Sequence, residues 1–143
     1  AVARLGDAWS VPASLAYVRG RNETDGRDLP EIPPLSGRAA LRYEQAAGRA
    51  WWSESGLRFA ARQDQVDEAF PEDETPSFVV YHLRGGLALT QQLSLEAGVE
   101  NLFDEDYHEH LTRETSLATG ELAAGDEVPA PGRSFYVKLT CVF

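Results

Sequence analysis

Cysteine and positive charge are both scarce in this sequence of 143 residues. The single cysteine, Cys141, excludes an intramolecular disulfide and a metal site built from several cysteines. Lysine and arginine total 13 against 23 aspartate and glutamate residues, which gives a net charge of -10. This balance repels nucleic acid phosphates and offers them no basic stripe, so the sequence predicts no nucleic acid partner.

Long apolar runs are also missing. No stretch approaches the ~20 apolar residues that a membrane-spanning helix needs, which excludes a helical span and leaves a β-barrel span open. The chain begins at Ala1 without methionine and without the charged and then apolar pattern of a secretion signal. We therefore expect Ala1 to be an internal position of a longer polypeptide.

What the sequence does contain is a period-two alternation of apolar and polar residues, which recurs along the chain while helical periodicity is nearly absent. The alternation predicts an all-β fold, an antiparallel β-meander of about six long strands. Strands of ten or so residues are long for a soluble sheet and match the ~9–11 residues that a tilted strand needs to cross a bilayer. The predicted strands are Asp7 to Arg19, Leu35 to Glu44, Trp51 to Gln63, Ser77 to Leu89, Leu93 to Asn101 and Gly132 to Phe143.

The predicted connections alternate between long polar segments and tight turns. Barrels with long external loops and short periplasmic turns have this alternation, so the first, third and fifth strands should run outward, toward the external loops. Phe143 is then expected on the periplasmic side. The long connections are Arg21 to Pro34, Asp64 to Pro76 and Leu102 to Pro131, and the short ones are Gln45 to Ala50 and Thr90 to Gln92.

Aromatic residues recur at both ends of the apolar strand face. Eight steps of ~3.3 Å along a strand tilted by ~40° project to roughly 20 Å, close to the ~25 Å apolar band between two aromatic girdles. A soluble sandwich would share the alternation but not the agreement between girdles and loop lengths. We therefore predict that the strands are part of a large transmembrane β-barrel. The aromatic pairs are Trp9 and Tyr17, Trp51 and Phe59, and Phe135 and Phe143; Trp9, Trp51, Tyr43 and Phe143 are expected at the periplasmic interface.

Three motifs carry a resemblance to a known family. The run Leu95-Glu96-Ala97-Gly98-Val99-Glu100-Asn101-Leu102-Phe103-Asp104-Glu105-Asp106-Tyr107 resembles the Asn-Leu-Phe-Asp-x-x-Tyr signature near the end of TonB-dependent outer-membrane receptors. Pro131-Gly132-Arg133-Ser134-Phe135-Tyr136-Val137 resembles their last strand, and Phe143 resembles their terminal aromatic. Leu29-Pro30-Glu31-Ile32-Pro33-Pro34-Leu35 resembles a strand start in them. The motif residues are expected to be structural: Asn101, Leu102, Phe103, Asp104, Tyr107, Pro131, Gly132, Arg133 and Phe143.

The resemblance implies a receptor in the outer membrane of a Gram-negative bacterium, with a barrel of about 22 strands closed by an N-terminal plug. Such receptors take up a scarce ligand such as an iron chelate, cobalamin or a metal ion, using energy delivered through TonB. Residues 1–143 would be the C-terminal part of the barrel domain, without the plug, the TonB-contacting segment and the earlier strands. The implied partners are outer-membrane lipid, the plug domain and remaining strands, TonB, and a small-molecule or metal-chelate ligand.

Charged residues on the polar strand face could bind an anionic chelate or the plug, although neutralisation between neighbouring strands is the favoured interpretation. Near the signature, Asp104, Asp106 and Glu109 accompany two histidines, but an acidic rim loop is more often solvated than metal-binding. We therefore predict no metal site, no cofactor and no catalytic residue. The possible ligand or lumen residues are Arg38, Arg42, Arg58, Arg62, Arg84, His108 and His110.

Two alternatives stay open at this point. A passive small outer-membrane barrel would share the strands and girdles but lack an upstream plug. A soluble β-barrel or sandwich that binds a small ligand would use the apolar face as its core. An enzyme is not supported, because no local arrangement of serine, histidine and aspartate indicates catalysis.

Overall fold

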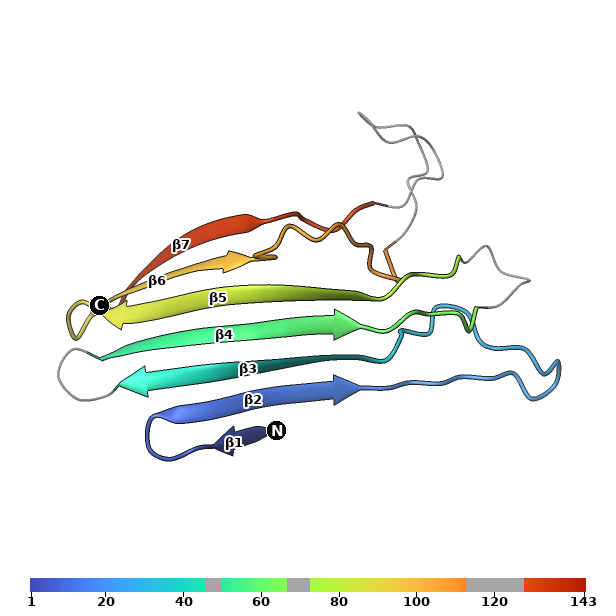
Figure 1. The fold of residues 1–143 in the computed structure, drawn as a ribbon, viewed down its shortest axis with the longest axis horizontal. Helices are drawn as coiled ribbons and strands as arrows, with labels where there is room; N and C mark the ends of the chain where they lie inside the picture. Colours follow the sequence, from blue (N-terminus) through green and yellow to red (C-terminus); the bar gives the residue numbers. More distant parts are fainter. Residues whose placement is uncertain (46–49, 67–72, 113–127) are drawn as a thin grey trace.

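The computed structural model describes residues 1–45, 50–66, 73–112 and 128–143. These residues form a single antiparallel sheet of seven strands, in which each strand pairs with its neighbours in the chain (Figure 1). No helix in this part of the chain is long and apolar enough to cross a bilayer. The strands are β1 (Val2–Arg4), β2 (Trp9–Ala16), β3 (Ser36–Gln45), β4 (Trp51–Ala60), β5 (Phe78–Ala88), β6 (Leu93–Glu100) and β7 (Ser134–Cys141).

The predicted meander is confirmed, and β2 to β7 are the six predicted long strands. The prediction missed β1, because three exposed residues are too few to show an alternation. β1 is held by backbone pairing with β2, with Val2 opposite Pro12, and the turn between the two strands contains Gly6 with a φ of 86°. The predicted strands also extended too far: β4 ends at Ala60 rather than Gln63, which forms an isolated bridge to Thr75.

The two ends of the sheet differ in their connections. The β1–β2 and β5–β6 turns lie at the end where the chain terminates, whereas the connections after β2, β4 and β6 leave from the opposite end (Figure 1). We call these the turn end and the loop end. The predicted turn between β3 and β4 lies largely outside the described residues. Elsewhere, the connections follow the predicted alternation of short turns and long loops.

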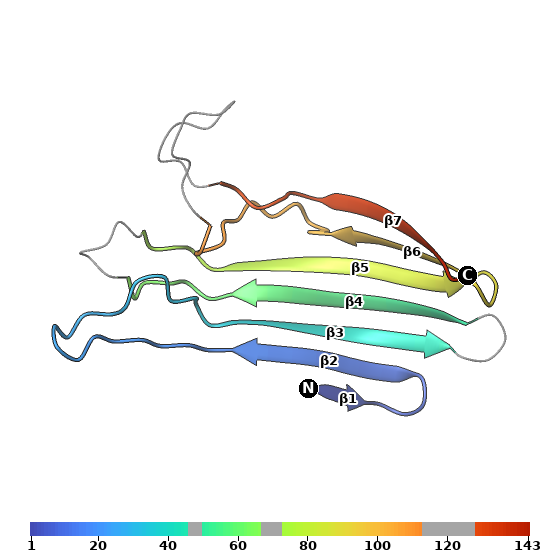
Figure 2. The ribbon, with the colours of Figure 1, turned by 180° about the vertical axis from the view of Figure 1, so that it is seen from behind.

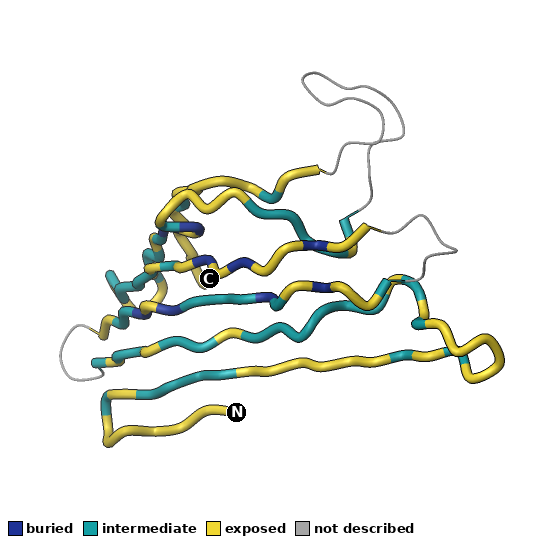
Figure 3. The backbone as a smooth tube through the Cα atoms, turned by 45° about the vertical axis from the view of Figure 1, so that its right-hand side comes forward, coloured by how far each residue is buried: buried dark blue, intermediate teal, exposed yellow. Residues whose placement is uncertain are grey.

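One face of the sheet is apolar and uncovered. Seen from opposite sides, the described strands form a single layer (Figure 1 and Figure 2). On this face Phe135 is 78% exposed and Val137 is 75% exposed. Buried segments are short and lie in the middle strands, while β1 and β7 are almost entirely exposed (Figure 3). Exposed apolar surface of this extent is unfavourable in water, so the face needs an apolar phase to cover it.

Aromatic side chains gather at both ends of the apolar face. At the turn end, Tyr43 lies 4.9 Å from Trp9 and 4.9 Å from Trp51, measured between ring centroids. At the loop end, Tyr81 and Phe103 make an edge contact at 5.2 Å. The register produces the first group, because Trp9 lies directly opposite Tyr43. This is the separation into two aromatic groups that a pair of girdles requires.

Candidate functional site

The strand register places three charged residues in one row on the polar face. Glu54 of β4 lies opposite Arg42 of β3 and opposite Arg84 of β5. All three have even numbers in paired strands, so the period of two brings them to the same face. Opposite charges directly across from each other stabilise neighbouring strands. The row therefore joins β3, β4 and β5 through their side chains.

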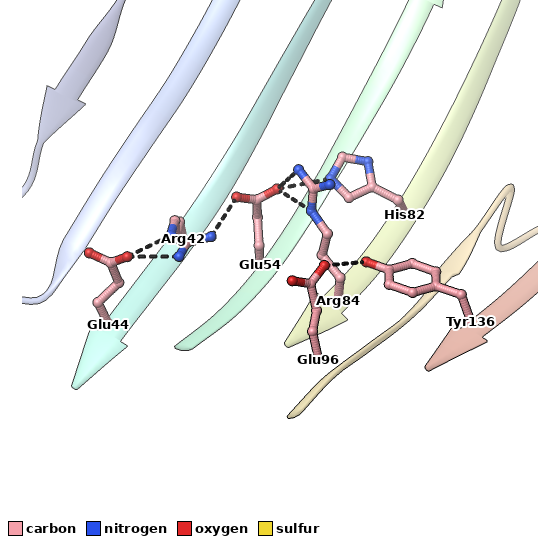
Figure 4. Close-up of polar contacts among 7 residues, drawn as sticks. All are labelled: Arg42, Glu44, Glu54, His82, Arg84, Glu96 and Tyr136. Atoms are coloured by element: carbon pink, nitrogen blue, oxygen red, sulfur yellow. Dashed lines mark hydrogen bonds and ion pairs between the residues drawn. The ribbon is translucent and has the colours of Figure 1, made fainter. Parts of the chain in front are cut away.

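Glu54 is the centre of this row and is 5% exposed. Its Oε1 atom accepts hydrogen bonds from Nε and Nη2 of Arg84 at 2.9 and 2.6 Å, and lies 3.2 Å from Nε2 of His82 (Figure 4). Its Oε2 atom lies 3.4 Å from Nη1 of Arg42, which also pairs with Glu44 at 2.8 Å. The carboxylates and guanidinium groups balance one another. This network is therefore a structural clamp with little charge left for a ligand.

Glycines on the polar face make room for large side chains. Gly56 lies opposite His82, and Gly98 lies opposite Tyr136. A Cβ atom at Gly98 would come within 2.7 Å of the Tyr136 ring, so the ring lies over the glycine backbone. The Tyr136 hydroxyl donates a hydrogen bond to Oε1 of Glu96 at 3.0 Å (Figure 4). These glycines give the charged network its close packing.

Sequence reasoning missed His82 and Trp52 as members of this network. Trp52 lies under the guanidinium of Arg42, with 4.0 Å between the guanidinium carbon and the ring centroid. Both residues have the parity of the polar face in the predicted strands. Their opposition to Gly56 and Gly86 was a further signal, because large side chains often lie over cross-strand glycines.

A second group of polar residues lies near the loop end. The guanidinium of Arg58 donates to the Tyr107 hydroxyl at 3.0 Å and pairs with Glu109 at 2.5 Å. It also lies over the Phe78 ring, 4.9 Å from the centroid. Tyr107 packs on Phe78 with 4.3 Å between ring centroids. The loop after β6 is thereby folded back onto the polar face and holds Arg58 in place.

A pocket of about 300 Å³ opens beside Arg58. Arg38, Arg58, His108 and His110 contribute to its lining. Nδ1 of His110 lies 2.8 Å from the Thr75 hydroxyl. β6 ends at Glu100, so His108 and His110 belong to a loop and not to a continued strand. The structure thus brings together four of the predicted ligand residues.

Arg62 lies outside this pocket. It follows the end of β4, its side chain is 64% exposed, and it pairs with Glu74. The hydrogen bond that Arg62 donates to the Glu74 carboxylate raises the pKa of the Arg62 guanidinium. Arg62 therefore belongs to the loop end and not to the polar face of the strands.

The Asn-Leu-Phe-Asp motif ties the end of β6 to the start of β7. Asn101 is 5% exposed and adopts a φ of 50°. Its side chain accepts from the Glu105 backbone N–H at 2.8 Å and donates to the Glu105 and Pro131 carbonyls at 2.8 and 3.3 Å. Asp104 accepts from the Arg133 backbone N–H at 2.7 Å. These contacts are those of a structural motif that closes the base of the loop.

Replacing Asn101 by alanine is expected to destabilise the full-length protein by about 2–3 kcal/mol, because the change removes three hydrogen bonds and leaves a non-glycine residue without a polar side chain at positive φ. The measurement is the unfolding midpoint of the purified full-length protein in detergent. Asp106→Ala, an exposed change in the same loop, is the control and should have almost no effect. Equal midpoints for the two variants would contradict the role of Asn101.

No group of three or more histidine, cysteine, aspartate or glutamate residues within the described ranges is arranged to hold a metal ion. His108 and His110 line the same pocket, but Thr75 already contacts His110. Cys141 is exposed at the end of β7. Among the described residues, the charged groups of the polar face are therefore mainly arginines and carboxylates, without a cluster of metal ligands.

The uncovered apolar face, the charged opposite face and the open strand edges together define a segment of the wall of a large β-barrel. Residues 2–102 match the family model described as TonB dependent receptor-like, beta-barrel. The chain therefore belongs to this family, as the sequence motifs predicted.

Two solved structures resemble the chain. The first, "Copper transporter OprC", is 37% identical with a TM-score of 0.87, and the alignment covers 99% of this chain and 22% of that one. The second is a mutant of the ferric enterobactin receptor PfeA from Pseudomonas aeruginosa, 22% identical with a TM-score of 0.69, covering 99% and 21%. The chain thus spans about a fifth of the length of these two structures. A comparison with curated proteins gave no significant match.

Proposed function

We propose that the full-length protein is a TonB-energised importer in the outer membrane of a Gram-negative bacterium. Residues 1–143 form the C-terminal part of its barrel domain, and the plug and earlier strands belong to the rest of the polypeptide. The observation that carries this proposal is a sheet with one apolar and one charged face in a chain that belongs to the barrel family of these receptors. Its apolar face suits lipid, and its charged face suits a wet lumen.

The open edges of the sheet support a barrel with more strands than the described residues form. β1 and β7 each pair with one neighbouring strand. An unpaired strand edge in lipid is costly, because backbone groups there have no water to bind, and bacterial single-chain barrels use at least about eight strands. In the proposed barrel, further strands of the full-length protein pair with β1 and β7. A passive small barrel remains a weaker candidate, because the family match is to receptors.

The function proposed is transport and not catalysis, and the partners are outer-membrane lipid, the plug, TonB and the cargo. Copper is the first cargo to test, because a copper transporter is 37% identical over 99% of this chain. The described residues do not themselves provide a metal cluster. In this proposal, capture of the metal depends on the plug, on other strands, or on a chelating group carried by the cargo.

The test is metal uptake by cells. Deletion of the gene is expected to lower cell-associated copper at limiting external copper, and complementation should restore it only in cells with functional TonB. Metal content is measured by mass spectrometry, with zinc as the comparison metal. Uptake that is equal with and without TonB would favour the passive barrel. Unchanged copper in the deletion strain would exclude copper as the cargo.

A further inference from the structure

Arg38 and Arg58 form an unusual pair on the polar face. They lie directly opposite each other in β3 and β4, where side chains of one face are about 4.5–5.5 Å apart at Cβ. Like charges in this position repel each other and destabilise the pairing of the strands. In the same strand pair Arg42 lies opposite Glu54, so a carboxylate at position 38 or 58 would have given a second ion pair. The repulsion within a pair of like charges is relieved when an oppositely charged group binds beside them.

The two arginines differ in their partners. Arg58 is held by Tyr107 and Glu109, and its side chain is still 40% exposed. Arg38 is exposed, and among residues 1–45, 50–66, 73–112 and 128–143 it has no hydrogen-bond or ion-pair partner. Arg42 and Arg84, farther along the same face, are both paired with Glu54. Positive charge is therefore left over at the loop end, where an external ligand arrives first in the proposed importer.

The space beside the pair fits a small molecule. Arg38 and Arg58 line the pocket of about 300 Å³ that includes His108 and His110, and they also line a second pocket of about 300 Å³ that reaches Asn101 and Ser134. Phe78 and Pro76 give the first pocket an apolar side. Pockets for small ligands have volumes from about 300 Å³ and combine apolar walls with a few placed polar groups.

We propose that Arg38 and Arg58 bind an oxyanion group of the cargo, such as a carboxylate of a metal chelate. A guanidinium presents a planar fork of N–H donors that matches carboxylate and phosphate oxygens in a bidentate manner. Two forks from adjacent strands can take two oxygens of one group or two groups of one chelate. A bare metal cation is repelled by the same pair. The proposal deepens the function above, on which it rests, by naming an anionic cargo.

The experiment measures binding to the purified full-length protein in detergent by equilibrium dialysis and mass spectrometry. The probes are copper(II) citrate, citrate alone, inorganic phosphate and copper(II) chloride. Arg38→Gln is expected to weaken binding of copper citrate about tenfold or more, because a charge-assisted bidentate contact is lost. Arg38→Lys should lose less, because it keeps the charge. Arg27→Gln, which removes an arginine paired with Asp25 outside both pockets, is the matched control and should bind like wild type.

Two results would overturn the proposal. The first is equal affinity of wild type and Arg38→Gln for copper citrate; if the unfolding midpoint of this variant is lowered at the same time, Arg38 belongs to contacts with the plug. The second is a wild-type protein that binds none of the three anionic probes at millimolar concentration. Binding in detergent does not need TonB, so these results are independent of the uptake test. Absence of the anion site would not contradict the proposed importer, and TonB-independent uptake would not contradict the anion site.

Discussion

Glu54→Ala is expected to lower the free energy of unfolding of the full-length protein by about 2–4 kcal/mol. Removing one partner of a buried ion pair costs about 3–5 kcal/mol, because the remaining charge has lost its compensation. The value is reduced here because the side chains of Arg42 and Arg84 are 25% and 38% exposed and keep some contact with water. The measurement is denaturant unfolding of the protein in detergent, followed by tryptophan fluorescence.

Glu44→Ala is the matched control for this change. Glu44 also pairs with Arg42, at 2.8 Å, but its side chain is 59% exposed. An exposed ion pair contributes only about 0–1 kcal/mol, so this variant should unfold close to wild type. Glu54→Gln keeps the shape and loses the charge, and it should fall between the two. If Glu44→Ala and Glu54→Ala cost the same, the row is not a clamp and its charges are solvated independently.

The sequence predicts the strands of this fold well, and for a physical reason. A strand in a barrel wall has lipid on one face and water on the other. Apolar and polar residues therefore alternate along β7 from Phe135 to Cys141. The alternation continues past the point where pairing stops. The alternation therefore places several strand ends too far along the chain, by three residues at Gln63, and the short β1 cannot be recognised from it.

The polar face was harder to predict, because parity gives the face of a residue but not its partner. Register decides that Arg84 reaches Glu54 while Arg38 meets another arginine, and register depends on where each hairpin turns. The contact between Arg58 and Glu109 is harder still. It joins β4 to a loop far along the chain, and no periodicity relates these two residues. Sequence reasoning therefore identified the arginines of the polar face but could not tell which of them have a carboxylate partner.

Gly56 provides the second large effect. It is buried between Ala40 and His82, the residues opposite it on β3 and β5. A Cβ atom at Gly56 would lie 2.6 Å from the Cβ atom of Ala40 and 2.6 Å from Cε1 of His82, well inside van der Waals contact. Gly56→Ala is therefore expected to cost about 1–3 kcal/mol, the range for overpacking, and Gly56→Val to cost more and to reduce the amount of folded barrel in the membrane.

A double-mutant cycle separates this clash from a general preference for glycine. Ala40→Gly removes the facing Cβ atom, and by itself should cost about 0.5–1 kcal/mol as a glycine within a strand. Combined with Gly56→Ala, it moves the methyl group across the strand pair, and the imidazole of His82 has free torsions with which to adjust. The double variant should cost less than the sum of the two single variants by at least about 1 kcal/mol. Strict additivity would mean that Ala40 is not what limits position 56, and the contact with the His82 ring would then be the one to vary next.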